Sequence, residues 1–321
     1  MNVDVEVTKN EYMEILGFIT FTYFSGKIAK VSGLFGGVRA LGEYLENFVY
    51  GKIAEVALAK FLERELKIKA LTDLDLPDFI LGEYLPDIVA FSVNGNAFVP
   101  AEFWIEVKEV RRGQKWFLVS ASSVRKRPYD AYVAVWVGLP DEHVAWLVSN
   151  VDEAKKKMSE QWKEKIRSLS DQIEKIPCRV VGFASWEDVK NVLRAREGDS
   201  RAGDELDEKF GKRHWYYFSG EEATFDPEDP RWRGAQVGEN VGFFLRGMQT
   251  ASDWIKFKNF IANNKRLVDL KVKPKRGEIA KGFEEDRREC CLILMKKQLE
   301  EMQRKFGSLR RKESWFSQPL R

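Results

Sequence analysis

The stretch that decides the fold spans residues 87–108 and reads DIVAFSVNGNAFVPAEFWIEVK. Two runs of apolar residues that favour β-strands flank the dipeptide Asn94-Gly95, which is a strong signal for a tight turn. The sequence therefore predicts a β-hairpin, with one strand before this turn and one after it.

The second strand of this hairpin carries different chemistry on its two faces. Side chains alternate along a strand, so Ile105 and Val107 would face the core, while Glu106 and Lys108 share the other face. The hairpin would bring Asp87 alongside them. Two carboxylates beside an ammonium group predict a Mg²⁺ site with an adjacent cation, because hard cations take oxygen ligands and a metal-activated water can act as a nucleophile.

Two alternatives remain open for the acids of this site. A strict two-residue turn at 94–95 would place Asp87 opposite Glu102, whereas a longer loop brings it near Glu106. A second Pro-Asp dipeptide lies nine residues earlier, so Asp78 is the alternative to Asp87. The strand pattern after the later dipeptide is stronger, which favours Asp87.

A helix is predicted over residues 41–66. Its apolar residues recur at steps of three and four, and Glu55 lies beside this stripe. The carboxylate of Glu55 would point toward the hairpin and complete the metal shell. The stripe comprises Leu41, Tyr44, Leu45, Phe48, Val49, Ile53, Val56, Ala57 and Phe61.

These pieces resemble a known family. Pro86-Asp87, Glu106-x-Lys108 and the upstream Glu55 are similar to the core motif of PD-(D/E)xK nucleases, over roughly residues 40–137. Within that superfamily the chain most resembles type II restriction endonucleases. The motif is short and degenerate, and its specificity lies in the order and spacing of the pieces.

The resemblance implies Mg²⁺-dependent cleavage of double-stranded DNA at a short sequence, by a homodimer with one site for each strand. Asp87 and Glu106 would hold the metal, and Glu55 would be an accessory ligand. Lys108 would orient or help deprotonate the attacking water and offset charge in the transition state. Two rivals are a structure-specific nuclease of the junction-resolvase kind and a non-catalytic nucleic-acid-binding module.

Basic residues follow the site directly and predict contacts with DNA phosphates. The first 110 residues hold 10 Lys and Arg against 17 Asp and Glu, so the chain's positive charge lies beyond them. The predicted phosphate-binding residues are Arg111, Arg112, Lys115, Arg125, Lys126 and Arg127.

Further elements predict an α/β fold with a mixed central sheet flanked by helices, a restriction-endonuclease-like core. Residues 129–137 are nearly all apolar and form a central strand, and 143–148 form another. A helix capped at Asn150 runs to about residue 175. A short strand at 179–183 and a helix at 186–195 follow.

The polar segment after residue 196 predicts a boundary between a nuclease core, 1–197, and a more helical C-terminal region, 207–321. The second region would carry DNA contacts, dimer contacts or both. Aromatic and basic residues are interleaved at 213–256, where a core role is favoured over base stacking. A helix at 283–306 carries an apolar stripe that fits a dimer seam or packing within the chain.

The composition excludes several classes of protein and of nuclease mechanism. The 321 residues include only His143 and His214, too few for nucleases that combine a histidine base with histidine metal ligands. Cys178, Cys290 and Cys291 cannot form a paired disulfide framework, which favours a reducing cytoplasm. No run approaches the ~20 apolar residues of a membrane span. Because the first residues include Asp4 and Glu6 and lack a basic segment followed by an apolar one, we expect no secretory signal.

Overall fold

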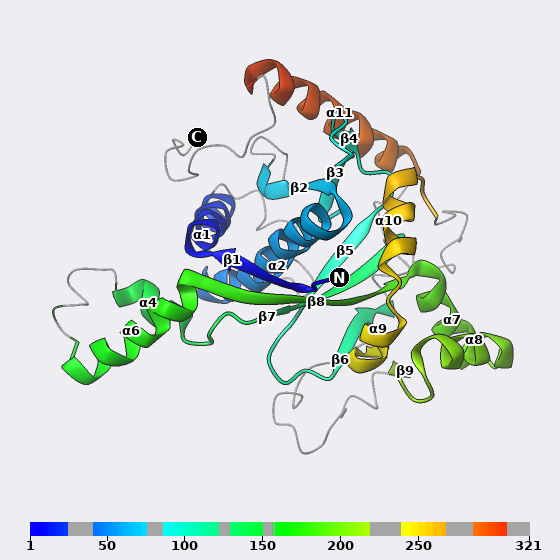
Figure 1. Ribbon diagram of the computed structural model, residues 1–321, viewed down its shortest axis with the longest axis horizontal. Coiled ribbons are helices and arrows are strands. Elements are labelled where there is room, and N and C mark those ends of the chain that lie inside the picture. The colour runs from blue at the N-terminus through cyan, green and yellow to red at the C-terminus, as the bar shows by residue number, and fades with distance from the viewer. Residues whose placement is uncertain are drawn as a thin grey trace.

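The protein is seen in a computed structural model, and the fold is the expected mixed α/β arrangement (Figure 1). At its centre is a four-stranded sheet in the order β1 (Asp4–Thr8), β8 (Lys175–Ser185), β7 (Ala131–Val137) and β5 (Ile105–Val110). The structure describes residues 1–24, 41–75, 86–121, 129–149, 156, 158–218, 239–267 and 285–306.

The central sheet is mixed because β5 runs parallel to β7, while the other neighbours are antiparallel. The prediction that residues 129–137 form a central strand is confirmed, since β7 is hydrogen-bonded on both sides and almost entirely buried. Among the described strands, β5 lies at the edge of this sheet. Its outward backbone groups are therefore not paired with any other strand that the structure describes.

One face of the central sheet is covered by α1 (Lys9–Phe24) and α2 (Leu41–Phe61) (Figure 1). The predicted helix at 41–66 is thus confirmed, with its last turn, Leu62–Leu66, wound as a π-helix. Side chains from both helices join the inward residues of the sheet in the largest hydrophobic core. α10 (Trp254–Asn263) contributes Phe257 and Ile261 to the same core.

The opposite face packs against a second sheet, ordered β6 (Trp116–Ser120), β10 (Asn240–Phe244) and β9 (Trp215–Phe218). Three helices complete this side: α7 (Trp186–Arg196), α8 (Ser200–Phe210) and α9 (Leu245–Ala251). The predicted helix at 186–195 is confirmed. Tyr217 of β9 lies in this core and Trp215 packs against it, in agreement with the core role, whereas Tyr216 is exposed.

At the predicted boundary between residues 1–197 and 207–321, the described residues on the two sides pack against each other. Helix α8 occupies most of the polar segment. Strand β10 pairs with β6, and Phe257 lies in the core built on α2. The described residues on the two sides of the division therefore share a sheet and a core, and separate domains remain a prediction.

A third sheet, β2 (Ile68–Thr72), β3 (Ile88–Val93) and β4 (Val99–Pro100), lies under α11 (Glu285–Phe306) (Figure 1). The predicted helix at 283–306 is confirmed. Met295 and Leu299 of α11 are buried against Leu71, Val89 and Ala90 of the sheet. This part of the apolar stripe serves packing within the chain.

The predicted hairpin is right at its turn and wrong in its second strand. Asn94 and Gly95 both have positive φ, as the turn requires, and β3 pairs with β4. The pairing then ends just beyond Pro100, where the Ala101 N–H still donates a hydrogen bond to the Val89 carbonyl at 2.9 Å. The chain bends at 102–103 and enters the central sheet as β5, so Glu106 and Lys108 lie on a strand of a different sheet.

The predicted strand at 143–148 is also wrong, because His143–Ser149 forms helix α4. Buried His143 and Trp146 are three residues apart, while Val144 and Val148 are about half exposed. That spacing is helical rather than alternating.

The next helix, α6 (Glu160–Glu174), ends where expected but begins later than predicted, with the Ser159 side chain as its N-cap. The proposed cap at Asn150 lies outside the described residues. The strand predicted at 179–183 is confirmed as part of the longer β8. None of the described helices is both long and apolar enough to cross a lipid bilayer.

Candidate active site

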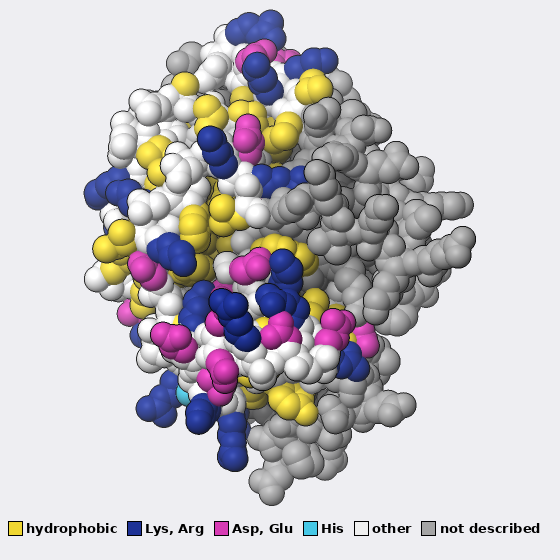
Figure 2. Space-filling model, turned by 90° about the vertical axis from the view of Figure 1, so that its right-hand side faces the viewer, with side chains coloured by type: hydrophobic (Ala, Val, Ile, Leu, Met, Phe, Trp, Pro, Cys, Tyr) yellow, Lys and Arg dark blue, Asp and Glu magenta, His cyan; other side chains and the backbone are white. Residues whose placement is uncertain are grey.

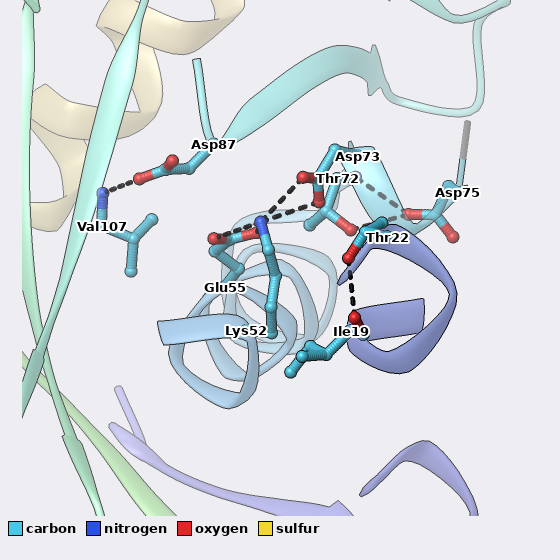
Figure 3. A network of polar contacts seen from close by, with 9 residues as sticks. All are labelled: Ile19, Thr22, Lys52, Glu55, Thr72, Asp73, Asp75, Asp87 and Val107. Carbon is cyan, nitrogen blue, oxygen red and sulfur yellow. Dashed lines mark hydrogen bonds and ion pairs between the residues drawn. The ribbon is translucent and has the colours of Figure 1, made fainter. Parts of the chain in front are cut away.

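The site forms where Asp87 meets the edge of β5. The backbone N–H of Val107 donates a hydrogen bond to Asp87 Oδ2 at 2.6 Å (Figure 3). Asp87 immediately precedes β3, so the third sheet is joined here to the central sheet by a side chain. The predicted meeting of Asp87 with Glu106 and Lys108 therefore occurs across a strand edge, and not within a hairpin.

Glu106 is the buried acid of this group, with only 8% of its surface exposed. Its Oε1 atom pairs with the Nζ atom of Lys108. Its Oε2 atom is buried and has no hydrogen-bond partner among the described residues. A carboxylate oxygen removed from water without a partner is costly, so Oε2 is suited to a cationic ligand.

Tyr132 is a neighbour of Glu106 that the sequence did not single out. The two residues are paired in the parallel register of β5 and β7. The Tyr132 hydroxyl is also buried, and within the described ranges it has no hydrogen-bond partner. Burial raises the pKa of Tyr132 well above its usual value, and the Glu106 carboxylate adds to this, so the phenol stays protonated.

The electrostatics of the site follow from burial and crowded acids. Burial raises the pKa of Asp87 to about 6, with Lys52 opposing and Glu106 adding to the effect. Burial alone would lower the pKa of Lys108, but the carboxylates of Glu106 and Asp87 more than offset it and raise the value. Lys108 is therefore an ammonium group, held beside an acid pair.

Glu55 is buried on α2 as expected, but it has a partner that was not predicted. Both of its carboxylate oxygens bind the Lys52 ammonium, at 2.8 and 2.9 Å. The same ammonium binds both oxygens of Asp73 (Figure 3). Burial raises the pKa of Glu55 well above its usual value, while Lys52 lowers it and Asp73 and Asp87 raise it further. Glu55 thus lies near the site, bound to an internal cation.

Sequence reasoning missed Lys52 and Asp73. Lys52 stands three residues before Glu55, a spacing that places the two on one helix face and was the only available signal. Asp73 reaches them because β2 leads back to α2 and ends in the short 3₁₀ turn Asp73–Asp75. No local sequence pattern predicts that β2 leads back to α2.

Of the two alternative acids that the sequence left open, only Glu102 can be compared with the structure. Glu102 is exposed, and its backbone N–H is bound by Asn264, whereas Glu106 lies next to the residue that contacts Asp87. Asp78 lies outside the described residues. The sequence alternative of Glu102 facing Asp87 is therefore not what the structure shows.

The predicted phosphate-binding residues divide into three groups. Arg111 stacks on the Tyr50 ring at 4.3 Å and pairs with Glu46 at 3.6 Å, so it is engaged with α2. Arg112 and Lys115 are exposed just beyond β5. The cluster at 125–127, namely Arg125, Lys126 and Arg127, lies outside the described residues.

On the face shown in Figure 2, the Lys and Arg side chains of the described residues lie among Asp and Glu side chains. The described part of this face therefore carries separate cations rather than a continuous basic stripe.

The side chains at this site could supply two of the oxygen ligands that a Mg²⁺ ion needs. No group of three or more His, Cys, Asp or Glu side chains within the described ranges is arranged to hold a metal ion. Mg²⁺, however, is commonly held by one or two carboxylates, with water and substrate phosphates completing its shell. Asp87 and the unpartnered oxygen of Glu106 supply such a pair, so these two residues fit the ion.

Comparison of the chain with protein-family models, with curated proteins and with solved structures finds no match. The functional argument therefore rests on the chemistry of the site itself.

Proposed function

We propose that this protein is a Mg²⁺-dependent DNA endonuclease that hydrolyses phosphodiester bonds in double-stranded DNA, in the manner of a type II restriction enzyme. The observation that carries the proposal is the meeting of Asp87, Glu106 and Lys108 at one strand edge, with a buried Glu106 oxygen that no other described residue binds. These are the residue types that hydrolysis of a phosphodiester needs: acids to hold a metal and a cation beside them.

In this proposal Asp87 and Glu106 hold the ion. Bound there, Mg²⁺ would act as a Lewis acid and lower the pKa of a coordinated water. Lys108 is fixed by Glu106 Oε1, so its ammonium is positioned to orient the attacking water and to offset negative charge that grows on the phosphate. Asp87 is fixed by the Val107 N–H, which leaves its other oxygen free of that bond.

DNA binding is assigned to the exposed cations beyond β5. Arg112 and Lys115 would contact backbone phosphates close to the cleavage point, together with the cluster at 125–127. A homodimer would present one site to each strand, and the enzyme would act in the cytoplasm. Arg111 has a different task, since its contacts with Tyr50 and Glu46 connect the end of β5 to α2.

The test is digestion of an unmethylated phage DNA of varied sequence, in Mg²⁺ and in EDTA. We compare the wild type with Lys108→Ala and with a control, Lys190→Ala, whose side chain is exposed and paired with Glu187 on α7. We expect discrete fragments from the wild type and the control in Mg²⁺ only, and at least a hundredfold less cleavage by Lys108→Ala.

Other outcomes separate the rivals. A Mg²⁺-dependent smear would indicate a nuclease without sequence readout, and cleavage confined to branched substrates would indicate a structure-specific enzyme. DNA binding without cleavage of linear or branched DNA, by a folded wild type, would refute the catalytic proposal in favour of a binding module.

A further inference from the structure

The Lys52 ammonium sits in a cage of four carboxylate oxygens. Its Nζ atom lies 2.8 and 2.9 Å from the two oxygens of Glu55, and 2.8 and 2.9 Å from the two oxygens of Asp73 (Figure 3). An ammonium group has three protons to donate, so four oxygens at these distances saturate it. The two acids come from different elements, α2 and the turn after β2.

This cage is buried and lies beside the proposed metal ligands. The exposed fractions of the side chains are 11% for Lys52, 7% for Glu55 and 16% for Asp73. Asp87 is close enough that its charge acts on both Lys52 and Glu55. Burial alone would lower the pKa of Lys52, but Asp73 and Glu55 raise it well above its usual value, so Lys52 is a permanent cation.

Charge balance over the whole cluster points to a single metal ion. With every acid counted as ionised, the four carboxylates and two ammonium groups give the cluster a formal charge of −2, which is its most negative value and which one divalent cation neutralises. A second divalent cation would leave an excess of +2 in a buried region, which is unfavourable before DNA binds. The six groups are Lys52, Glu55, Asp73, Asp87, Glu106 and Lys108.

We infer that Lys52 occupies, as an internal cation, the place that a second metal would take, so that the site binds one divalent ion rather than two. The ion binds to Asp87 and Glu106, and Glu55 positions Lys52 instead of ligating metal. This inference rests on the proposed function, and it makes Lys52 a positioning residue that decides the metal stoichiometry.

The experiment counts Mn²⁺ ions bound per chain, from the electron paramagnetic resonance signal of free Mn²⁺ during titration of the full-length protein without DNA. We expect one ion for the wild type. Lys52→Met keeps the length of the side chain but removes its charge, so Glu55 and Asp73 become available and the count rises to two. Lys60→Met is the control: Lys60 is on the same helix, pairs with Glu11, and its loss should leave one ion.

A second pair of variants keeps the inference testable if Lys52→Met does not fold, as judged by circular dichroism. Glu55→Gln should still bind one Mn²⁺, with at most about tenfold weaker affinity, whereas Asp87→Asn should lose binding by at least a hundredfold. Loss of the ion in Glu55→Gln, two ions in the wild type, or one ion in folded Lys52→Met would each overturn the inference. No Mn²⁺ binding by the wild type would instead contradict the proposed function, so the two failures are distinguishable.

Discussion

Asn264 offers the sharpest test of how the fold positions the site. It ends α10 with a left-handed backbone, φ 43°. Its Oδ1 atom accepts hydrogen bonds from the N–H groups of Glu102, at 3.0 Å, and Phe103, at 3.3 Å. Its Nδ2 atom donates to the carbonyl of Pro100 at 2.8 Å. One side chain thus holds the bend that delivers the chain into β5.

The perturbation is Asn264→Gly, which removes all three hydrogen bonds but tolerates the left-handed backbone. Hydrogen bonds of this kind each contribute about 0.5–1.5 kcal/mol net, and the one to Glu102 is exposed. We expect the free energy of unfolding to fall by about 2 kcal/mol. Asn264→Ala loses the same bonds and also strains a left-handed residue, so it should lose about 1 kcal/mol more.

The assay is urea unfolding followed by circular dichroism at 222 nm, with the midpoint and the slope fitted together. Asn263→Ala is the matched control, because Asn263 is the exposed residue before Asn264 and its replacement should change stability by no more than about 0.5 kcal/mol. If Asn264→Gly matches the wild type within that margin, the clamp contributes nothing. If Asn264→Ala is the more stable of the two variants, the argument from the left-handed cap is refuted.

Three further predictions concern packing, capping and pH. Gly182→Ala should lower the free energy of unfolding by about 1–3 kcal/mol in urea titrations, because the added Cβ would lie 2.8 Å from the carbonyl oxygen of Met248. Asp188→Ala should cost about 2 kcal/mol in the same assay, since it removes the N-terminal capping box of α7 and leaves the Lys209 ammonium without its acid. Burial lowers the pKa of His143, so the unfolded chain binds the proton more readily and stability should fall as pH drops below about 6.5. Melting temperatures at pH 7 and pH 5 measure that loss, and His143→Gln should reduce it; an equal loss in the variant would contradict the assignment.

Elements whose partners lie close by in sequence, or whose pattern is long, could be predicted from the residues alone. The apolar stripe of α2, the continuous apolar run of β7 and the repeat of α11 each identified their element. In each of these patterns the spacing of the apolar residues identifies the face that the element buries, and that spacing can be read from the sequence alone. The error at α4 has the same origin, since a short apolar segment does not distinguish a helix from a strand.

Strand pairing was predicted less well, because it depends on contacts far apart in the chain. The Asn94-Gly95 turn correctly joined β3 to β4, but a turn does not determine how long the pairing lasts. At the end of this pairing the Pro100 carbonyl and the Glu102 N–H are bound by Asn264, a residue more than 160 positions away. No local pattern contains that information.

The residues of the candidate site also divide into those that the sequence could predict and those that it could not. Asp87, Glu106 and Lys108 could be predicted because their spacing on two strands carried the signal. Lys52 and Asp73 could not, because their contact joins segments 21 residues apart through the direction of β2.

The position of the site follows from β5 being an edge strand. An edge presents unpaired N–H groups that invite another strand, and proteins commonly cover such edges. Here the Asp87 carboxylate takes the Val107 N–H, at the place where a neighbouring strand would otherwise bind. A side chain can be held there beside Glu106 because none of the described strands pairs with this edge of β5. The acid pair and the protected edge are therefore two consequences of one contact, which explains why Asp87 serves both the fold and the proposed chemistry.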